Sequence, residues 1–282
     1  MNNQKEIFDL ASIECSKKIT SSYSTSFSFA IKMLKKEYRD AIYSIYGFVR
    51  LADEIVDSFH NYDKTKLLEN LRYTTINSIE KGISLNPIIN SFQNTVKKYK
   101  IEWELIDNFL ESMEYDLSNN TCDNESYKTY IQGSAAAVGL MCLQVFNKNN
   151  TISYHKLKPY AESLGCAFQK INFLRDINMD YKNLNRVYFP NINISKFDNK
   201  EKKKIEDDIE KDFHEALKGI KLLNNEAKKG VYLAYKYYIV LFNKIKNLDA
   251  QELFKHRIRI SNFRKILITI SSFIRIKLGL IN

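Results

Sequence analysis

The chain has 282 residues, of which 44% are hydrophobic, and this composition is enough for a sizeable core. Only eight glycines and three prolines occur, which favours long helices and argues against a turn-rich β protein. The net charge of +10 indicates polyanionic partners, such as phosphorylated substrates, acidic lipids or nucleic acid. No RNP-like motif, zinc finger or compact helix-turn-helix pattern is present, so no nucleic-acid partner is expected.

The cysteine spacing and the N-terminus indicate where the protein resides. The four cysteines are scattered without CxxC spacing, which argues against a disulfide framework or a zinc site and fits a reducing compartment. The N-terminus lacks the apolar region of a signal peptide, and no stretch approaches the roughly 18 apolar residues of a membrane span. We therefore expect a cytoplasmic protein, at most peripheral on the inner face of the cell membrane.

Apolar residues recur with helical spacing from end to end of the chain. The pattern predicts helices, in chain order, over residues 35–60, 64–81, 87–99, 101–118, 124–147, 151–182, 201–224, 229–247 and 262–279. A polar break at 181–200, which contains Pro190, interrupts them. There is no internal repeat and no linker rich in Gly, Ser or Pro. The sequence therefore predicts an all-α fold, a single helical domain over residues 1–282.

Two aspartate pairs with i, i+4 spacing carry the clearest chemical signal: Asp53 with Asp57, and Asp176 with Asp180. Residues four apart lie on one face of a helix, so each pair presents two carboxylates side by side. Two such pairs on facing helices would form a polyanionic cleft, which is costly unless a cation fills it. Hard oxygen ligands favour Mg²⁺, usually shared with substrate phosphates.

Further polar residues extend the first pair into a stripe. Tyr46, Arg50, Asp53 and Asp57 are spaced 4, 3 and 4, which places them on one helix face. Arg50, one turn before the pair, can hold a phosphate oxygen. Taken alone, this first motif is better explained as an ordinary exposed Arg–Asp pair on a solvated face, because so short a motif is common.

The second pair also belongs to a stripe, and here a functional interpretation is favoured. Its members are Gln169, Asn172, Asp176 and Asp180. Apolar residues flank this stripe instead of opposing it, and a helix that is apolar on most sides is normally buried. Because buried carboxylates need partners, we expect this stripe to face a ligand.

Other stretches leave two interpretations open. Residues 130–141, YIQGSAAAVGLM, form a predicted helix lined with small residues, which lets either another helix or a long apolar ligand approach closely. Ser24 and Ser26 lie at an expected helix start, where they can favour an anion or simply cap the helix. Four residues flank the second pair and can serve the same anionic ligand: Arg175, Lys182, Arg186 and Tyr188.

Several stretches, taken together, resemble the squalene/phytoene synthase family of head-to-head prenyl transferases, in particular its bacterial phytoene synthases: YSTSFSFA, YGFVRLADEIVD, GSAAAVGLM and LGCAFQKINFLRDINMDYKNLNRVYFP. The likeness covers nearly the whole chain. It implies an all-α isoprenoid-synthase bundle with a central apolar cavity, closed at one end by the two acidic motifs. It also implies a Mg²⁺-dependent prenyltransferase of carotenoid biosynthesis that acts on prenyl diphosphates.

The resemblance further implies roles for individual residues. The metal ligands, for Mg²⁺ or alternatively Mn²⁺, would be Asp53, Asp57, Asn172, Asp176 and Asp180. The diphosphate contacts would be Arg50, Ser24, Ser26, Gln169, Asn172, Arg175 and Arg186. Tyr46 and Tyr238 match tyrosines near the reacting centre. Many relatives carry a distinctive residue, often tyrosine, two positions after Tyr130, but this chain has Gln132, which weakens any proton-handling role there.

The expected reaction joins two geranylgeranyl diphosphates through a cyclopropylcarbinyl diphosphate to give phytoene, without NADPH. Condensation of two farnesyl diphosphates to dehydrosqualene or squalene is the alternative. Chain-elongating prenyltransferases and terpene cyclases are disfavoured, because neither DDxxD nor an Asn/Ser/Glu motif is present. A basic helical protein that binds anionic lipid or nucleic acid is the non-enzyme alternative, and it leaves the two acidic pairs unexplained.

The C-terminal stretch, residues 262–279, is basic and partly apolar. It fits either a helix that rests on a membrane surface or an ordinary core helix, and the sequence leaves both open. The sequence makes no prediction of oligomeric state.

Overall fold

The computed structural model describes residues 4–119, 121–148, 150–190 and 192–281. Within them the chain forms twelve α-helices: α1 Gln4–Tyr23, α2 Thr25–Lys32, α3 Lys36–Asp57, α4 Lys64–Lys81, α5 Pro87–Tyr99, α6 Trp103–Ser118, α7 Asn124–Ile131, α8 Ala137–Asn147, α9 Tyr154–Leu184, α10 Asn199–Leu222, α11 Asn225–Lys246 and α12 Asn262–Lys277. A π-helical turn, Gln132–Ala136, joins α7 to α8. Short 3₁₀ turns lie at Ile194–Lys196 and Ala250–Phe254. The described residues contain no strand, and the predicted all-α fold is confirmed.

The predicted helices agree with the observed ones to within a few residues, and their ends have local causes. The largest difference is at α11, which begins at Asn225, one turn before the predicted start. Asn224 caps it, because its side chain accepts a hydrogen bond from the Ala227 amide at 2.9 Å. Hydrophobic periodicity does not reveal such a helix start, because the capping residue is not part of the apolar stripe.

Helix α1 was not predicted, and its packing explains why. Its buried residues are all small and polar: Ser12, Ser16 and Thr20. The Ser16 hydroxyl lies 2.7 Å from that of Ser91 on α5, and Gly47 of α3 packs directly against Ser16. A helix that packs through hydroxyls and a glycine has no apolar stripe to detect.

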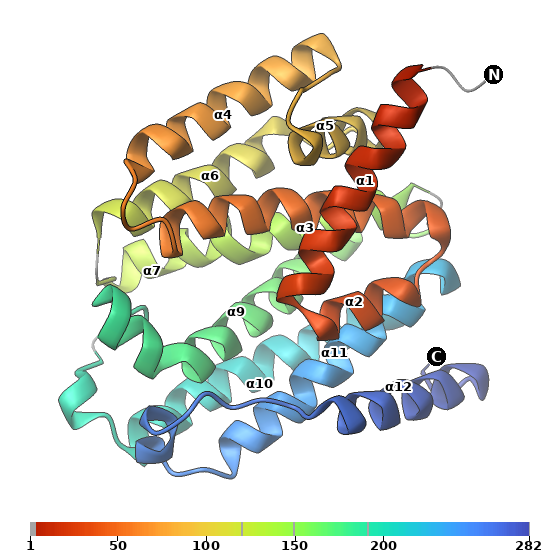
Figure 1. Cartoon of the computed structure of the whole chain (residues 1–282). Coiled ribbons are helices and arrows are strands. Elements are labelled where there is room, and N and C mark those ends of the chain that lie inside the picture. The colour runs from red at the N-terminus through yellow and green to blue at the C-terminus, as the bar shows by residue number, and fades with distance from the viewer. Residues whose placement is uncertain (1–3, 120, 149, 191, 282) are drawn as a thin grey trace.

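Helices α3 and α9 run through the middle of the bundle (Figure 1). Helix α3 packs against α1, α5 and α8, whereas α9 packs against α8 and α10. The core is divided into two main hydrophobic clusters, one centred on α3, α5, α6 and α8 and the other on α9, α10 and α11. Phe27 of α2 and Val231 of α11 contact both clusters. The space between the clusters is therefore walled by helices that are far apart in sequence.

The small residues of 130–141 pack closely against another helix, and some of them also line a cavity. For packing, a Cβ atom on Gly139 would lie 2.9 Å from the carbonyl oxygen of Ala161, and one on Gly165 would lie 2.5 Å from that of Ala135. Helix α9 thus touches α8 and the π-helical turn backbone to backbone. Ser134, in the same stretch, lines the cavity described below.

We expect Gly165→Ala to destabilise the protein by about 1–3 kcal/mol, because the added methyl group has to separate α9 from the π-helical turn. Urea denaturation measures the change in the free energy of unfolding. Lys156→Ala, at an exposed position of the same helix, is the matched control and should change stability by less than about 0.5 kcal/mol. Equal effects of the two substitutions would argue against the close contact.

Two expectations about membranes are corrected by the structure. The stretch Asn124–Asn147 is long and apolar enough for a membrane span, although none was expected, and 61% of its most apolar window is buried inside the protein. Such burial is also found in core helices of soluble proteins. The interpretation of residues 262–279 as an ordinary core helix is wrong, because Ser272 is the one buried residue of α12.

Candidate active site

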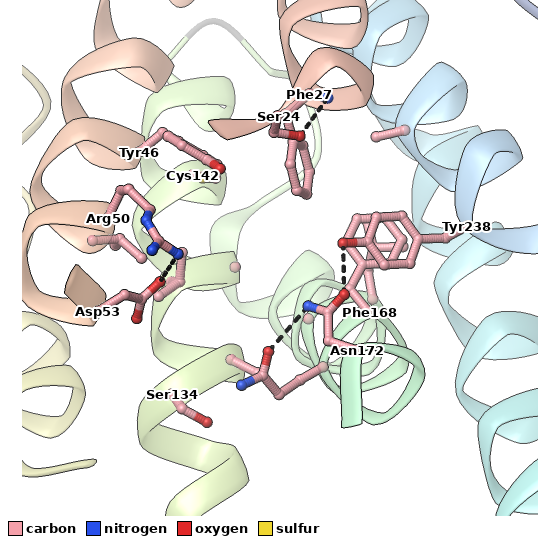
Figure 2. Close-up of a pocket in the computed structure, with 18 of the residues that line it drawn as sticks. Ser24, Phe27, Tyr46, Arg50, Asp53, Ser134, Cys142, Phe168, Asn172 and Tyr238 are labelled. Carbon is pink, nitrogen blue, oxygen red and sulfur yellow. Dashed lines mark hydrogen bonds and ion pairs between the residues drawn. The ribbon is translucent and has the colours of Figure 1, made fainter. Parts of the chain in front are cut away.

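A cavity of about 720 Å³ lies between the two hydrophobic clusters. Both predicted polar stripes line it in full: Tyr46, Arg50, Asp53 and Asp57 of α3, and Gln169, Asn172, Asp176 and Asp180 of α9. Figure 2 shows Arg50 and Asp53 on one side of the cavity and Asn172 on the other. The bland interpretation of the first stripe as a solvated surface pair is therefore wrong.

On α3, Arg50 is held by its own helix. Its Nε atom donates to a carboxylate oxygen of Glu54 at 3.1 Å, and a second nitrogen of the guanidinium contacts the same oxygen. The carboxylate of Asp53 lies further away, at 3.9 Å. The guanidinium also lies over the ring of Tyr23, 4.3 Å from its centroid. Arg50 is thus fixed beside Asp53, although its closest partner is the glutamate.

On α9, the carboxylate of Asp176 is clamped by two arginines. Arg175 Nε donates to it at 3.1 Å, and Arg257, which follows a 3₁₀ turn near the C-terminus, approaches it to 2.7 Å. Asp180, one turn later, has no such partner among the ion pairs of the described residues and faces the cavity. Arginine side chains of the protein thus already balance the charge of Asp176, whereas that of Asp180 is left for a ligand or cation to balance.

A buried arginine connects the first acidic pair to a third carboxylate. Arg186 donates to Asp57 at 2.9 Å and to the backbone carbonyl of Asp116 at 2.8 Å. The carboxylate of Asp116 is buried, and one of its oxygens accepts from the Tyr130 hydroxyl at 2.7 Å. Its other oxygen has no hydrogen-bond partner among the residues that the structure describes. Arg186 thus links Asp57 of α3 to Asp116 of α6.

The charges of the two pairs influence each other across the cavity. The pKa of Asp180 is raised to about 8, mainly by burial and then by the nearby charges of Asp176 and Asp57. Burial likewise raises the pKa of Asp53 to about 7, with Asp57 as the next cause. Like-charged groups in a partly dry site disfavour each other's ionised forms. The expectation that the two acidic pairs face one another is supported by this coupling between α3 and α9.

These raised pKa values predict how the metal-free protein responds to pH. Because the folded state holds protons on Asp53 and Asp180 that the unfolded state releases near pH 4, stability should fall as pH rises from about 4 to about 8. The measurement is the unfolding temperature against pH, in chelator, for the wild type and for Asp53→Asn/Asp180→Asn. Near pH 8 the variant should unfold on the order of 5 °C higher. Parallel curves for the two proteins would contradict the pKa shifts.

The donor set fits a hard divalent cation bound together with a ligand. All the candidate donors are oxygens: the four aspartates and the amide oxygen of Asn172. In the described part of the chain, no three acidic, histidine or cysteine side chains stand close enough to hold a metal by themselves. Mg²⁺ in phosphate sites is commonly held by one or two carboxylates while the ligand's phosphates complete the coordination. A metal bound by this chain would therefore need a phosphorylated ligand to complete its site.

Aromatic rings form the wall beyond the polar stripes. Phe27 of α2 contacts the rings of Tyr46, Phe168 and Tyr238, with centroids 5.7 to 6.1 Å away. Tyr238 of α11 stacks on Phe168 at 3.9 Å, and its hydroxyl donates to Asn172 at 3.2 Å. Burial raises the pKa of Tyr46. Both predicted tyrosines therefore line the cavity as neutral rings close to the acidic residues.

Of the remaining residues that the sequence analysis singled out, some line the cavity and others do not. Ser24 caps α2, since its hydroxyl accepts from the Phe27 amide at 3.2 Å, and it also lines the cavity. Ser26 is not among the lining residues, so its predicted diphosphate contact has no support in this geometry. Arg186 reaches the site through Asp57 instead of lining the cavity itself. Gln132 is exposed, away from the cavity.

Three residues of the site were missed in the sequence, and two of them had a signal there. Asp116 lies three residues after Met113, on the apolar stripe of α6, where a charged residue is anomalous. Glu54 lies four residues after Arg50, the spacing that favours an ion pair on a helix. Arg257 lies in irregular chain, where no periodicity applies, so only the fold brings it to Asp176.

The fold and the cavity define a class of protein: an all-α bundle in which two acidic helices face each other across an aromatic, largely apolar pocket. A model of the squalene/phytoene synthase family matches residues 20–264. The chain belongs to the squalene/phytoene synthase family, whose members are prenyltransferase-type enzymes, as the resemblance predicted.

Individual relatives are distant. The 4,4'-diapophytoene synthase of Staphylococcus haemolyticus (strain JCSC1435) is 23% identical over 275 residues, which cover 88% of this chain and 91% of that protein. The phytoene synthase of Mycobacterium bovis (strain ATCC BAA-935 / AF2122/97) is 24% identical over 178 residues, 61% of this chain and 55% of that protein. The second match thus spans about half of the relative.

Solved structures agree on the fold. A crystal structure of a dehydrosqualene synthase in complex with ligand superposes with a TM-score of 0.79 at 18% identity, over 95% of this chain and 98% of that one. A squalene synthase from Alicyclobacillus acidocaldarius gives 0.73 at 20% identity, over 84% and 94%. At these identities the likeness concerns the fold, and the substrate has to be argued from the site.

Proposed function

We propose that this protein condenses two prenyl diphosphates head to head into a linear hydrocarbon, in a reaction that requires Mg²⁺. One observation carries the proposal: two i, i+4 aspartate pairs from α3 and α9 line one cavity whose remaining wall is apolar and aromatic. The acidic part suits a metal–diphosphate group, and the apolar part suits prenyl chains. A protein that only binds lipid or nucleic acid has no use for such facing carboxylates.

The reaction balances in two stages. First, one allylic diphosphate leaves as inorganic diphosphate, and the double bond of the second substrate attacks the resulting carbocation. Loss of one proton then gives a cyclopropylcarbinyl diphosphate. In the second stage the remaining diphosphate leaves, the cation rearranges, and loss of another proton gives the hydrocarbon. The sum is two prenyl diphosphates converted to one triene core, two diphosphates and two protons, with no reductant.

The chain's own residues supply binding and orientation. Asp53, Asp57, Asp176, Asp180 and Asn172 would hold the metal. Bound Mg²⁺ supplies positive charge that stabilises the departing diphosphate. Arg50 and Arg175 are now paired with Glu54 and Asp176 respectively. An entering diphosphate would compete for both guanidinium groups, so that ion pairs of the ligand-free protein are exchanged for contacts with the leaving group.

The aromatic wall protects and stabilises the cationic intermediates. Carbocations are quenched by water, so the reacting carbons have to lie in the apolar part of the cavity. Rings such as Phe27, Phe168 and Tyr238 present negative ring faces that attract a positive centre. Tyr46, neutral because its pKa is raised, adds a polar edge without adding charge.

Two substrate lengths are candidates. The resemblance of the sequence favours two geranylgeranyl diphosphates, with phytoene as the product. The match to the 4,4'-diapophytoene synthase, which covers most of both chains, supports the C15 alternative, in which two farnesyl diphosphates give dehydrosqualene. Side chains at the apolar end of the cavity decide between them.

The test is incubation of the purified protein with Mg²⁺ and each radiolabelled diphosphate, alone and in competition, with and without NADPH. We expect a C40 or a C30 hydrocarbon that forms without NADPH, does not form in chelator, and is accompanied by release of two diphosphates per product. Folded protein that yields no hydrocarbon from either substrate in the presence of Mg²⁺ would refute the proposal.

A further inference from the structure

Helix α12 presents its most apolar side to solvent. Seven large apolar residues with helical spacing form this side, which we call the α12 face: Phe263, Ile266, Leu267, Ile270, Phe273, Ile274 and Leu278. Their exposed fractions range from 47% for Phe273 to 71% for Phe263. Exposed apolar patches of this kind mark interaction sites in soluble proteins.

The opposite side of α12 holds the helix to the protein through polar contacts together with the apolar side chains of Ile268 and Ile276. The Tyr237 hydroxyl of α11 lies 2.7 Å from that of Thr269, and Lys265 contacts the Thr25 hydroxyl of α2. Ser272, the buried residue of the helix, also lies on this side. Surface helices normally turn their apolar stripe to the core and their polar residues outward. Helix α12 instead leaves its larger apolar side in solvent, which makes this outer side a candidate docking surface.

The charge around the α12 face identifies what it docks on. From Leu253 to the C-terminus the sequence has seven lysines and arginines and no aspartate or glutamate: Lys255, Arg257, Arg259, Arg264, Lys265, Arg275 and Lys277. Arg264, Arg275 and Lys277 are exposed on α12 itself. A second copy of this chain would bring a segment of the same positive charge against this one, which is unfavourable. Nucleic acid would satisfy the cations but leave the apolar side chains in water.

A membrane surface with anionic lipids satisfies both properties of the segment. We propose that α12 is an interfacial helix that docks the protein on such a bilayer, with the α12 face at the boundary between headgroups and acyl chains. The exposed Arg264, Arg275 and Lys277 then pair with lipid phosphates, and the apolar side chains are removed from water. The helix has 16 residues and lies along the lower edge of the molecule beside α11 (Figure 1), so it can lie flat on a surface.

The position of α12 also relates the membrane to the cavity. Ile268, on the inner side of α12, packs against a buried cluster that contains Ala30 of α2, and Ala234 of α11 packs against the same cluster. Both alanines line the cavity. Docking through α12 would therefore set the α2–α11 wall of the cavity next to the bilayer. If the proposed function is right, a hydrocarbon product that cannot dissolve in water would leave through this side.

The test is flotation of the full-length protein with lipid vesicles, and it does not require enzymatic activity. Vesicles of phosphatidylcholine alone are compared with an equal mixture of phosphatidylcholine and phosphatidylglycerol. We expect binding to the mixed vesicles that weakens as salt is added, because salt screens the charge. Ile266→Gln/Ile270→Gln/Phe273→Gln should weaken the binding on the order of a hundredfold, because three apolar side chains no longer enter the bilayer.

Matched controls separate the α12 face from general properties of the surface. Ile7→Gln/Leu10→Gln/Leu85→Gln removes three exposed apolar residues elsewhere and should bind like the wild type. Arg264→Gln/Arg275→Gln/Lys277→Gln should lose the preference for anionic vesicles, whereas Lys200→Gln/Lys204→Gln/Lys211→Gln, the same charge change on α10, should keep most of it. All these positions are exposed, so unchanged helicity is expected throughout.

Two results would overturn the proposal. The first is a failure of the vesicle test: the wild type does not float with anionic vesicles, or Ile266→Gln/Ile270→Gln/Phe273→Gln binds them as tightly as the wild type does. The second is a wild type that binds no vesicles and is a dimer in analytical ultracentrifugation, while the same variant is a monomer. That outcome would assign the α12 face to a second copy of the chain.

Discussion

Asp53→Asn and Asp176→Asn should each lower kcat/KM by about a thousandfold or more, and Asp53→Asn should do so with no loss of stability. Each substitution keeps the shape of the side chain and removes one charge that would hold the metal–diphosphate group. Asp53, whose pKa is raised to about 7, destabilises the ligand-free protein when it ionises. Its replacement should therefore leave the unfolding temperature unchanged or raise it at neutral pH.

The measurement is steady-state kinetics with the preferred prenyl diphosphate, paired with thermal unfolding of the same samples. Asp207→Asn is the matched control. Asp207 is an exposed helical aspartate paired with Lys203 four residues earlier, and its replacement should leave both quantities unchanged. If the site variants instead unfolded at lower temperature and kept their turnover, the aspartates would have a structural role.

Arg186→Met should destabilise the protein by about 3 kcal/mol at pH 8, because it leaves the buried carboxylate of Asp116 without a cation. Arg186 is 6% exposed and also bonds Asp57 and the Asp116 carbonyl. Burial raises the pKa of Asp116 to about 7, so this carboxyl becomes neutral in mild acid. Because Arg186 lowers this pKa, the loss of stability should shrink as pH falls toward about 7 and level off below it.

Chemical denaturation at several pH values measures this effect. Adding Asp116→Asn to Arg186→Met should recover much of the loss, because the unpaired charge is then gone. Arg72→Met removes an arginine that pairs with two surface carboxylates, those of Asp107 and Glu114, and should cost about 1 kcal/mol or less. Equal losses for the two arginine variants, or no recovery in the double variant, would argue against the Arg186–Asp116 interaction.

Local patterns in the sequence predicted the helices and the two polar stripes. The stripe through Asp176 lies on a helix that is apolar on most sides, so its position inside the protein followed from composition and spacing. The sequence of one stretch does not show which distant residue a side chain will contact in the fold. Arg186 meets Asp57 across 129 residues, and Arg257 meets Asp176 across 81, and no local pattern connects either pair.

Other features were missed because their packing does not use apolar residues. Helix α1 packs through serines and a threonine, and the π-helical turn at Gln132–Ala136 has no distinct period. For α12, the apolar stripe was visible in the sequence, but only the fold shows that it faces outward. Amphipathicity defines two sides of a helix and does not say which side meets the core.

The central claim is that the aspartate pairs of α3 and α9 form one site. Calorimetric titration with an unreactive prenyl thiolodiphosphate tests it directly, with and without Mg²⁺, for the wild type, Asp53→Asn, Asp176→Asn and the double variant. We predict Mg²⁺-dependent binding that falls about a hundredfold in either single variant, with little further loss in the double variant, because both carboxylates serve the same group. Tight binding without Mg²⁺, or independent losses that add in full, would contradict a shared site.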